Sequence, residues 1–165
     1  MIFDINMGDK FCRKSRFVAG GHMTETPTTL TYASVVSRYL VPTELTIAAL
    51  DGLGIFSCDI QNAYLTTECR EKMWTRAGPE FGSEAGRIKI VKMALYCLKS
   101  SSAVFLVHLY QNLNSIWFLY TKADHDVWYW PVFKPNGFEY YECILCYVDG
   151  ILCISCDPGI MLGQI

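Results

Sequence analysis

The chain has 165 residues, of which 52% are hydrophobic, and a formal net charge of -2 at pH 7. This length and composition exclude a disordered tail and allow one domain with a sizeable core. A net charge so near zero also excludes a whole-molecule positive field that would attract nucleic acid, so any such binding must be local.

Targeting signals are the next feature. The first residues, MIFDINMGDK, contain early acids and no long apolar run, which is not typical of a signal peptide. No apolar run approaches the roughly 18 residues of a membrane span. Eight cysteines without a secretory signal indicate reduced thiols. We therefore expect an intracellular protein that does not contact a membrane.

The first half of the chain predicts a strand, a helix and a second strand. Residues 11–18 have the pattern of a basic strand, followed by paired glycines that permit a sharp turn or a close backbone approach. Residues 42–50 predict a short helix with Pro42 in its first turn. Residues 53–59 predict a strand that ends at Asp59.

The second half predicts a long helix between strands. Residues 86–96 alternate lysine with apolar residues as a strand does, and a helix is expected from Ser100–Ser102 to about residue 117. Segments 123–133 and 138–148 predict two strands joined by a turn. Helices and strands mixed in this order favour an α+β fold, with helices packed on an antiparallel sheet.

The segment CILCYVDGILCISC, residues 143–156, predicts a hairpin with Asp149 and Gly150 as its turn. In that register Cys146 opposes Cys153 and Cys143 opposes Cys156. Side chains alternate between the faces of a strand, so the two cysteine pairs lie on opposite faces and cannot converge on one zinc ion. We interpret the thiols as packing residues, with a Cys143–Cys156 crosslink left open.

Asp59 and Asp149 are each expected at the end of a strand. Two such carboxylates, if brought together, suit Mg²⁺, which prefers hard oxygen ligands and commonly binds carboxylates together with substrate phosphates. A pair of these ions catalyses phosphoryl transfer. The alternatives are ordinary turn chemistry at Asp149 and a capping role for Asp59.

Motifs in a fixed order carry a family resemblance. CDIQNAYL at 58–65 resembles the Asp-x-x-x-Ala-aromatic-Leu motif of reverse transcriptases, and YVDG at 147–150 resembles their Tyr-x-Asp-Asp hairpin. Further matches are KSRFVAGGHMTE at 14–25, YASVVSR at 32–38, LTIAAL at 45–50, RAGPEFG at 76–82, ALYCLKS at 94–100 and KADHDVW at 122–128. From Lys14 to Ser155 the chain thus resembles the RNA-directed DNA polymerase of copia-type LTR retrotransposons.

This resemblance implies a fold, a chemistry and partners. It implies a partial reverse-transcriptase domain over 1–165, with about 10–58 mainly fingers, 59–156 mainly palm and no thumb. The implied partners are an RNA or DNA template-primer and deoxynucleotide triphosphates, and the location is the cytoplasm or an element-derived particle. Asp59 and Asp149 would be the catalytic residues and ligands of two Mg²⁺ ions. The implied nucleotide-binding residues are Lys14, Arg16, Tyr64, Tyr96 and Lys99.

Individual roles follow from the same resemblance. Tyr64 would be the steric gate that disfavours a 2′-hydroxyl, or otherwise an ordinary core aromatic. Lys14 and Arg16 would face the triphosphate, because cationic donors suit phosphate oxygens. Tyr96 and Lys99 would lie near the nucleotide and the template strand.

The chain also departs from the family pattern. The second hairpin aspartate is replaced by Gly150, which removes one of three expected carboxylates and predicts a large loss of polymerisation. Cys97 stands where the family usually has glycine, which strains any position that needs a positive φ. Segments 102–105, SAVF, and 41–44, VPTE, lack expected arginine or tryptophan residues. We interpret these changes as decay.

Two other functions compete with an impaired polymerase. The first is a non-catalytic nucleic-acid-binding or interaction remnant that uses two basic windows. These windows are Lys10, Arg13, Lys14 and Arg16, and Arg87, Lys89, Lys92 and Lys99. The second is a cysteine-based metal module in segment 143–156, which the face argument opposes.

Overall fold

A computed structural model describes residues 2–6, 12–16, 18–28 and 30–165, with side chains from residue 18 onward apart from Met23. The chain divides into two compact units. The first contains residues 1–32 and 62–105, and the second contains residues 33–61 and 106–165. Each unit therefore combines two separate segments of the chain, which passes between the units three times.

The first unit is built from short elements. Two antiparallel ribbons are present, β1 (Ile2–Asn6) with β2 (Cys12–Arg16) and β4 (Trp74–Arg76) with β5 (Ile88–Ile90). The 3₁₀ helices are η1 (Gly21–Met23), η2 (Ala63–Thr66) and η3 (Pro79–Glu84). The strand expected over 86–96 is thus confined to β5. Beyond it Met93 and Tyr96 make only isolated bridges, to Glu68 and Val18.

Gly21 makes the close backbone approach that its sequence context suggested. A Cβ atom at this position would lie 1.8 Å from the carbonyl oxygen of Cys97, which is well inside van der Waals contact. Cys97 itself has a φ of 69°, in the left-handed region that disfavours residues with a Cβ atom. The strain predicted for a cysteine at this turn is therefore present.

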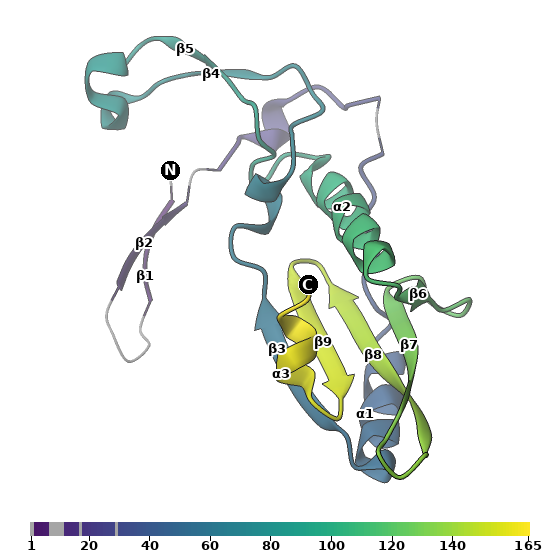
Figure 1. Ribbon diagram of the computed structural model, residues 1–165. Coiled ribbons are helices and arrows are strands. Elements are labelled where there is room, and N and C mark those ends of the chain that lie inside the picture. Colours follow the sequence, from purple (N-terminus) through teal and green to yellow (C-terminus); the bar gives the residue numbers. More distant parts are fainter. Residues whose placement is uncertain (1, 7–11, 17, 29) are drawn as a thin grey trace. The chain divides into compact units, whose positions relative to one another are not determined.

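The second unit holds one five-stranded antiparallel sheet in the order β3-β9-β8-β7-β6 (Figure 1). Its strands are β3 (Gly54–Asp59), β6 (Leu119–Tyr120), β7 (Val127–Phe133), β8 (Glu139–Tyr147) and β9 (Gly150–Ser155). Its helices are α1 (Leu40–Asp51) and α3 (Pro158–Leu162), and α2 (Ser101–Ser115) enters it from the first unit. Helices packed on an antiparallel sheet are the α+β class that the sequence predicts.

Side chains alternate between the two faces of the sheet, and each face has its own buried core. On one face, Val127, Cys143, Leu145 and Ile154 form a buried cluster with Val36 and with Ala48 of α1. On the other, Trp128, Ile144, Cys146 and Cys153 are fully buried. The ring of Tyr110 on α2 lies 5.0 Å from that of Trp128, and α3 contacts β3 and β9. The sheet is therefore covered by α1 on one side and by α2 and α3 on the other.

Helix α1 shows how local sequence sets the boundaries of an element. The expected helix over 42–50 extends by two residues at its start and one at its end. It stops at Gly52, whose φ of 62° closes the helix in the left-handed conformation that glycine adopts without strain. The next residue, Leu53, bonds back to the carbonyl of Ala48, and β3 begins at Gly54. This short connection places Asp59 at the far end of β3.

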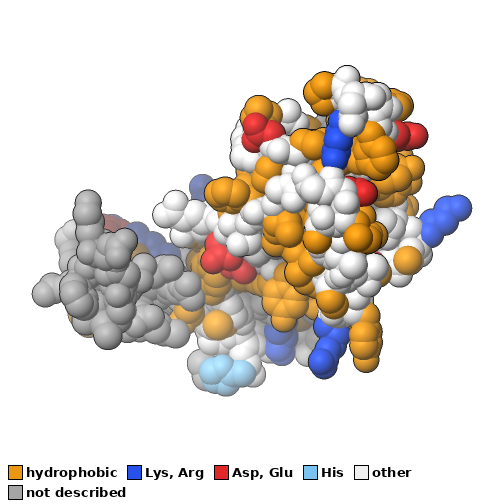
Figure 2. All heavy atoms as spheres, turned by 90° about the horizontal axis from the view of Figure 1, so that it is seen from below, with side chains coloured by type: hydrophobic (Ala, Val, Ile, Leu, Met, Phe, Trp, Pro, Cys, Tyr) orange, Lys and Arg blue, Asp and Glu red, His pale blue; other side chains and the backbone are white. Residues whose placement is uncertain are grey.

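Large hydrophobic side chains are also found on the surface. Figure 2 shows them in orange over much of the described surface that it presents. Leu50, Tyr39 and Ile90 are each more than three-quarters exposed. Among the described residues, none of the helices combines the length and the apolar character needed to cross a bilayer.

Candidate metal-dependent site at the β3 and β8–β9 strand ends

Asp59 is the last residue of β3, and its partner across the ladder is Gly150, the first residue of β9. Ser57 and Leu152 are the next pair on the same face of the sheet. The Asp59 side chain is exposed, in contrast to the buried strands beside it. The prediction that a β-rich segment ends at Asp59 is confirmed.

The hairpin turn differs from the prediction by one residue. Tyr147 pairs with Gly150, so the two turn residues are Val148 and Asp149 rather than Asp149 and Gly150. The positive φ belongs to Val148, at 57°, and Gly150 is not among the residues with positive φ. The backbone therefore does not require glycine at position 150. The strained, positive-φ position is instead occupied by Val148, a β-branched residue.

Asp149 is held next to the β3 strand end. Its backbone carbonyl accepts a hydrogen bond of 2.8 Å from the N–H of Ile60, the residue after Asp59. The Asp149 side chain is half-buried. The two aspartates, 90 positions apart in sequence, thus lie on directly adjoining backbone segments.

Position 150 faces Asp59. A Cβ atom built on Gly150 would lie 3.5 Å from Oδ1 of Asp59, an ordinary van der Waals contact, and 3.2 Å from the backbone oxygen of Tyr147. A side chain at this position would therefore project beside the Asp59 carboxylate. The family resemblance predicts an aspartate at position 150, and a carboxylate at this position would lie beside that of Asp59.

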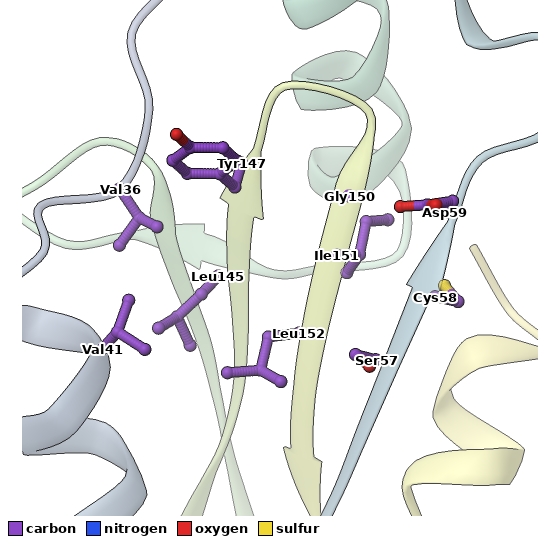
Figure 3. Close-up of a pocket in the computed structure, with 10 residues that line it drawn as sticks. All are labelled: Val36, Val41, Ser57, Cys58, Asp59, Leu145, Tyr147, Gly150, Ile151 and Leu152. Carbon is purple, nitrogen blue, oxygen red and sulfur yellow. The ribbon is translucent and has the colours of Figure 1, made fainter.

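A cavity of about 420 Å³ lies alongside these residues (Figure 3). Its polar side chains include Asp59, Ser57 and Tyr147. Its apolar wall includes Val36, Val41, Leu145 and Leu152. The size falls in the range of small-molecule sites. Sequence reasoning did not identify Ser57 or Tyr147 as lining residues. Period-two alternation from Asp59 would have placed Ser57 on this face, whereas Tyr147 lies on it because it pairs with Gly150 across the hairpin.

The shift of the turn also corrects the predicted cysteine pairing. Cys146 opposes Ile151 and Cys143 opposes Ile154, so neither faces another cysteine across the ladder. All seven cysteines in the part of the chain whose side chains are described are free, including Cys143 and Cys156. Within that part, no group of three or more His, Cys, Asp or Glu side chains is arranged to hold a metal ion.

The thiols of this segment behave as packing groups. Burial raises the pKa of Cys146, with smaller contributions from the charges of Asp126 and Cys153. Burial likewise raises the pKa of Cys153 to about 12. Cys58, next to Asp59, also has a raised pKa, caused first by burial and then by the Asp59 charge. Neutral thiols are poor metal ligands.

The first unit contains all five expected nucleotide-binding residues, and the side chains of Tyr64, Tyr96 and Lys99 are described. The rings of Tyr64 and Tyr96 are 4.8 Å apart, and Tyr64 also meets Phe105 edge-on at 5.9 Å. Nζ of Lys99 donates a hydrogen bond of 2.8 Å to the backbone oxygen of Thr24. Tyr64 is thus half-buried in an aromatic cluster with Tyr96, and both its steric-gate role and its core role stay predictions.

Lys14 and Arg16 lie on β2, where they pair with Asp4 and Ile2 of β1. Their side chains fall outside the described residues, as does the predicted contact with a triphosphate. Lys10 falls outside them entirely.

The second basic window is largely engaged within the chain. Arg87 and Lys89 both pair with Glu84, at 2.8 and 2.5 Å. These contacts hold the pKa of Glu84 below its usual range, chiefly through the hydrogen bond from Lys89. With Lys99 bonded to Thr24, Lys92 is the remaining member, and it is exposed. The window is not a uniform band of solvated positive charge.

Comparison with known proteins gives the origin of the chain. It is 30% identical over 148 residues to the Transposon Ty1-NL2 Gag-Pol polyprotein of Saccharomyces cerevisiae, and 34% identical over 147 residues to the Truncated transposon Ty1-A Gag-Pol polyprotein of the same organism. These similarities support a copia-type retrotransposon origin. Each covers 87% of this chain but only 8% and 12% of the two relatives, so the chain spans about a tenth of their length. No family model and no solved structure matches this retrotransposon-derived chain.

Proposed function

We propose that the chain is a fragment of a retrotransposon RNA-directed DNA polymerase whose two-Mg²⁺ nucleotidyl transfer is impaired at position 150. The observation that carries this proposal is the cross-strand pairing of Asp59 with Gly150, one residue after Asp149. It brings the two resembling segments, 58–65 and 147–150, to one edge of one sheet. The retrotransposon origin of the chain supports the same assignment.

The site residues fit a metal only in part. Asp59 and Asp149 offer hard carboxylate oxygens, which Mg²⁺ prefers, on adjoining backbone segments. Gly150 offers none, and no cluster of three ligands is found in the described part of the chain. The residues present therefore do not fit a two-ion site, and no catalytic step is derived through one.

Each residue has a part in the proposed chemistry. Asp59 and Asp149 would position the metal, and the cavity beside Asp59 would receive part of the substrate. Tyr64 and Tyr96, whose rings are tilted by 55° to each other, would contact the nucleotide, and Lys14, Arg16 and Lys99 would contact phosphates. Lys99 would have to exchange its bond to Thr24 for such a contact.

The proposal of an impaired polymerase is tested by whether the chain forms a complex with both a template-primer and a nucleotide. We expect the chain to bind an RNA–DNA template-primer whose primer has a chain-terminated 3′ end. When Mg²⁺ and the triphosphate complementary to the next template base are present, we expect a larger fraction of this complex to remain after competitor DNA is added. A gel-shift assay with each of the four triphosphates measures this selectivity. Equal retention with all four nucleotides would identify a simple nucleic-acid-binding remnant instead, and absence of any complex would contradict both functions.

A further inference from the structure

A second cavity, of about 540 Å³, is found in the second unit and takes no part in the site described above. Its lining residues come from α1, β7, β8 and β9 and from the segments beside them. Figure 1 labels these four elements. Its lining residues are Glu44, Ile47, Asp51, Leu53, Thr121, Val127, Tyr129, Glu139, Tyr140, Tyr141, Cys143 and Ile154. This volume is that of a typical small-molecule site.

Two tyrosines form an aromatic corner in this cavity. The rings of Tyr129 and Tyr141 meet edge to face, with centroids 5.7 Å apart and an angle of 81° between their planes. Tyr141 is 52% exposed, so its ring is accessible to a ligand. Ring faces carry negative potential and attract cations, most strongly where the cation is shielded from water. Ile47, 43% exposed, adds an apolar surface suited to alkyl groups.

The charged side chains that line this cavity are acidic. Glu44, Asp51 and Glu139 line the cavity, and its described lining residues include no lysine, arginine or histidine. The ion pairs found among the described residues both involve Glu84 and none of these three carboxylates. The Cys143 thiol in the lining stays neutral, because burial and the Glu44 carboxylate raise its pKa to about 12.

The chain's own Lys134 shows how an ammonium group is held near these walls. Its Nζ donates a hydrogen bond to the backbone oxygen of Asp51. The same atom lies 5.4 Å from the ring centroid of Phe138 and 5.7 Å from that of Tyr140. Two lining residues, Asp51 and Tyr140, thus already contact one ammonium group, and Lys134 itself is not among the lining residues.

We propose that this cavity binds a small organic ammonium ion, with its cationic head in the Tyr129–Tyr141 corner and its charge balanced by Glu44 and Glu139. The aromatic corner supplies the cation–π attraction, the carboxylates select the sign of the charge, and Ile47 contacts the alkyl part. This site is independent of the polymerase proposal, since it shares no lining residue with the cavity beside Asp59.

Choline and its neutral carbon isostere, 3,3-dimethylbutan-1-ol, are the probes that test this site. They have nearly the same shape and differ in charge. Titration of the full chain followed by amide NMR shifts is expected to show saturable binding of choline at α1 and β7–β8, at least about 5-fold tighter than binding of the alcohol. Equal affinities, or no saturable binding of choline, would overturn the proposal.

Matched variants separate the aromatic and ionic contributions. Tyr141→Leu and Glu139→Gln change exposed side chains, so both variants are expected to fold, and each weakens choline binding by about 2-fold to 5-fold. Glu139→Gln leaves binding of the neutral alcohol unchanged. Tyr32→Leu and Glu80→Gln, exposed positions in the first unit, serve as controls and leave choline binding unchanged. Wild-type affinity in both cavity variants would contradict the assigned site.

Discussion

Gly150→Asp is expected to raise Mg²⁺-dependent primer extension by about 100-fold or more over the wild-type chain. Loss of groups that only support a metal ligand already lowers metal affinity or activity by about 10–100-fold, and a missing ligand is expected to matter at least as much. The backbone accepts the change, because Gly150 does not have a positive φ. Its Cβ atom would point to within 3.5 Å of Asp59 Oδ1.

The matched control for this prediction is Gly150→Asn, which has nearly the same shape without the carboxylate. Asparagine at position 150 should leave primer extension at the wild-type level, as should Gly150→Asp combined with Asp59→Asn. The Cβ contact of 3.2 Å with the Tyr147 backbone oxygen requires a shift of a few tenths of an ångström, which both variants share. Equal rates for the aspartate and asparagine variants would show that charge at position 150 is not what the site lacks.

Gly21→Ala is expected to destabilise the chain by about 3 kcal/mol. The added Cβ atom would lie 1.8 Å from the Cys97 carbonyl oxygen and 3.0 Å from its carbonyl carbon. Both are backbone atoms, so no side-chain rotation relieves the overlap. A typical domain has only about 5–15 kcal/mol of total stability, which makes this a large loss. Urea denaturation followed by circular dichroism measures it.

The neighbouring glycine provides the control. Gly20 has a φ of -79°, which alanine adopts freely, and Gly20→Ala should change the free energy of unfolding by less than about 1 kcal/mol. If Gly21→Ala were as mild as Gly20→Ala, the close approach of Gly21 to Cys97 would not exist in solution.

The elements set by local patterns were predicted well from the sequence. Helix α1 and strand β3 have strong signals, a proline near the first turn and a β-rich run ending in a polar residue. The helix expected from the Ser100–Ser102 segment is also present, as α2. The strand over 86–96 was overestimated, because alternation alone does not guarantee a partner, and β5 finds one only along Trp74–Arg76.

The hairpin register could not be predicted from turn propensity. Asp-Gly is a strong signal for a two-residue turn, but pairing of Gly150 with both Tyr147 and Asp59 moves the turn one residue earlier. This shift assigns the positive φ to Val148, a residue that propensity would place there last. The orientation of position 150 toward Asp59 depends on that register, so it became visible only in the folded chain.

The proposed metal site is tested most directly by locating a bound ion. Fe²⁺ can replace Mg²⁺, and with ascorbate and peroxide it generates hydroxyl radicals that cut the backbone near the ion. We predict cuts around residues 58–60 and 148–151, stronger in Gly150→Asp than in the wild-type chain and suppressed by excess Mg²⁺, when fragments are mapped by mass spectrometry. Cuts confined to other segments, or unaffected by the residue at position 150, would contradict a shared metal site at Asp59 and Asp149.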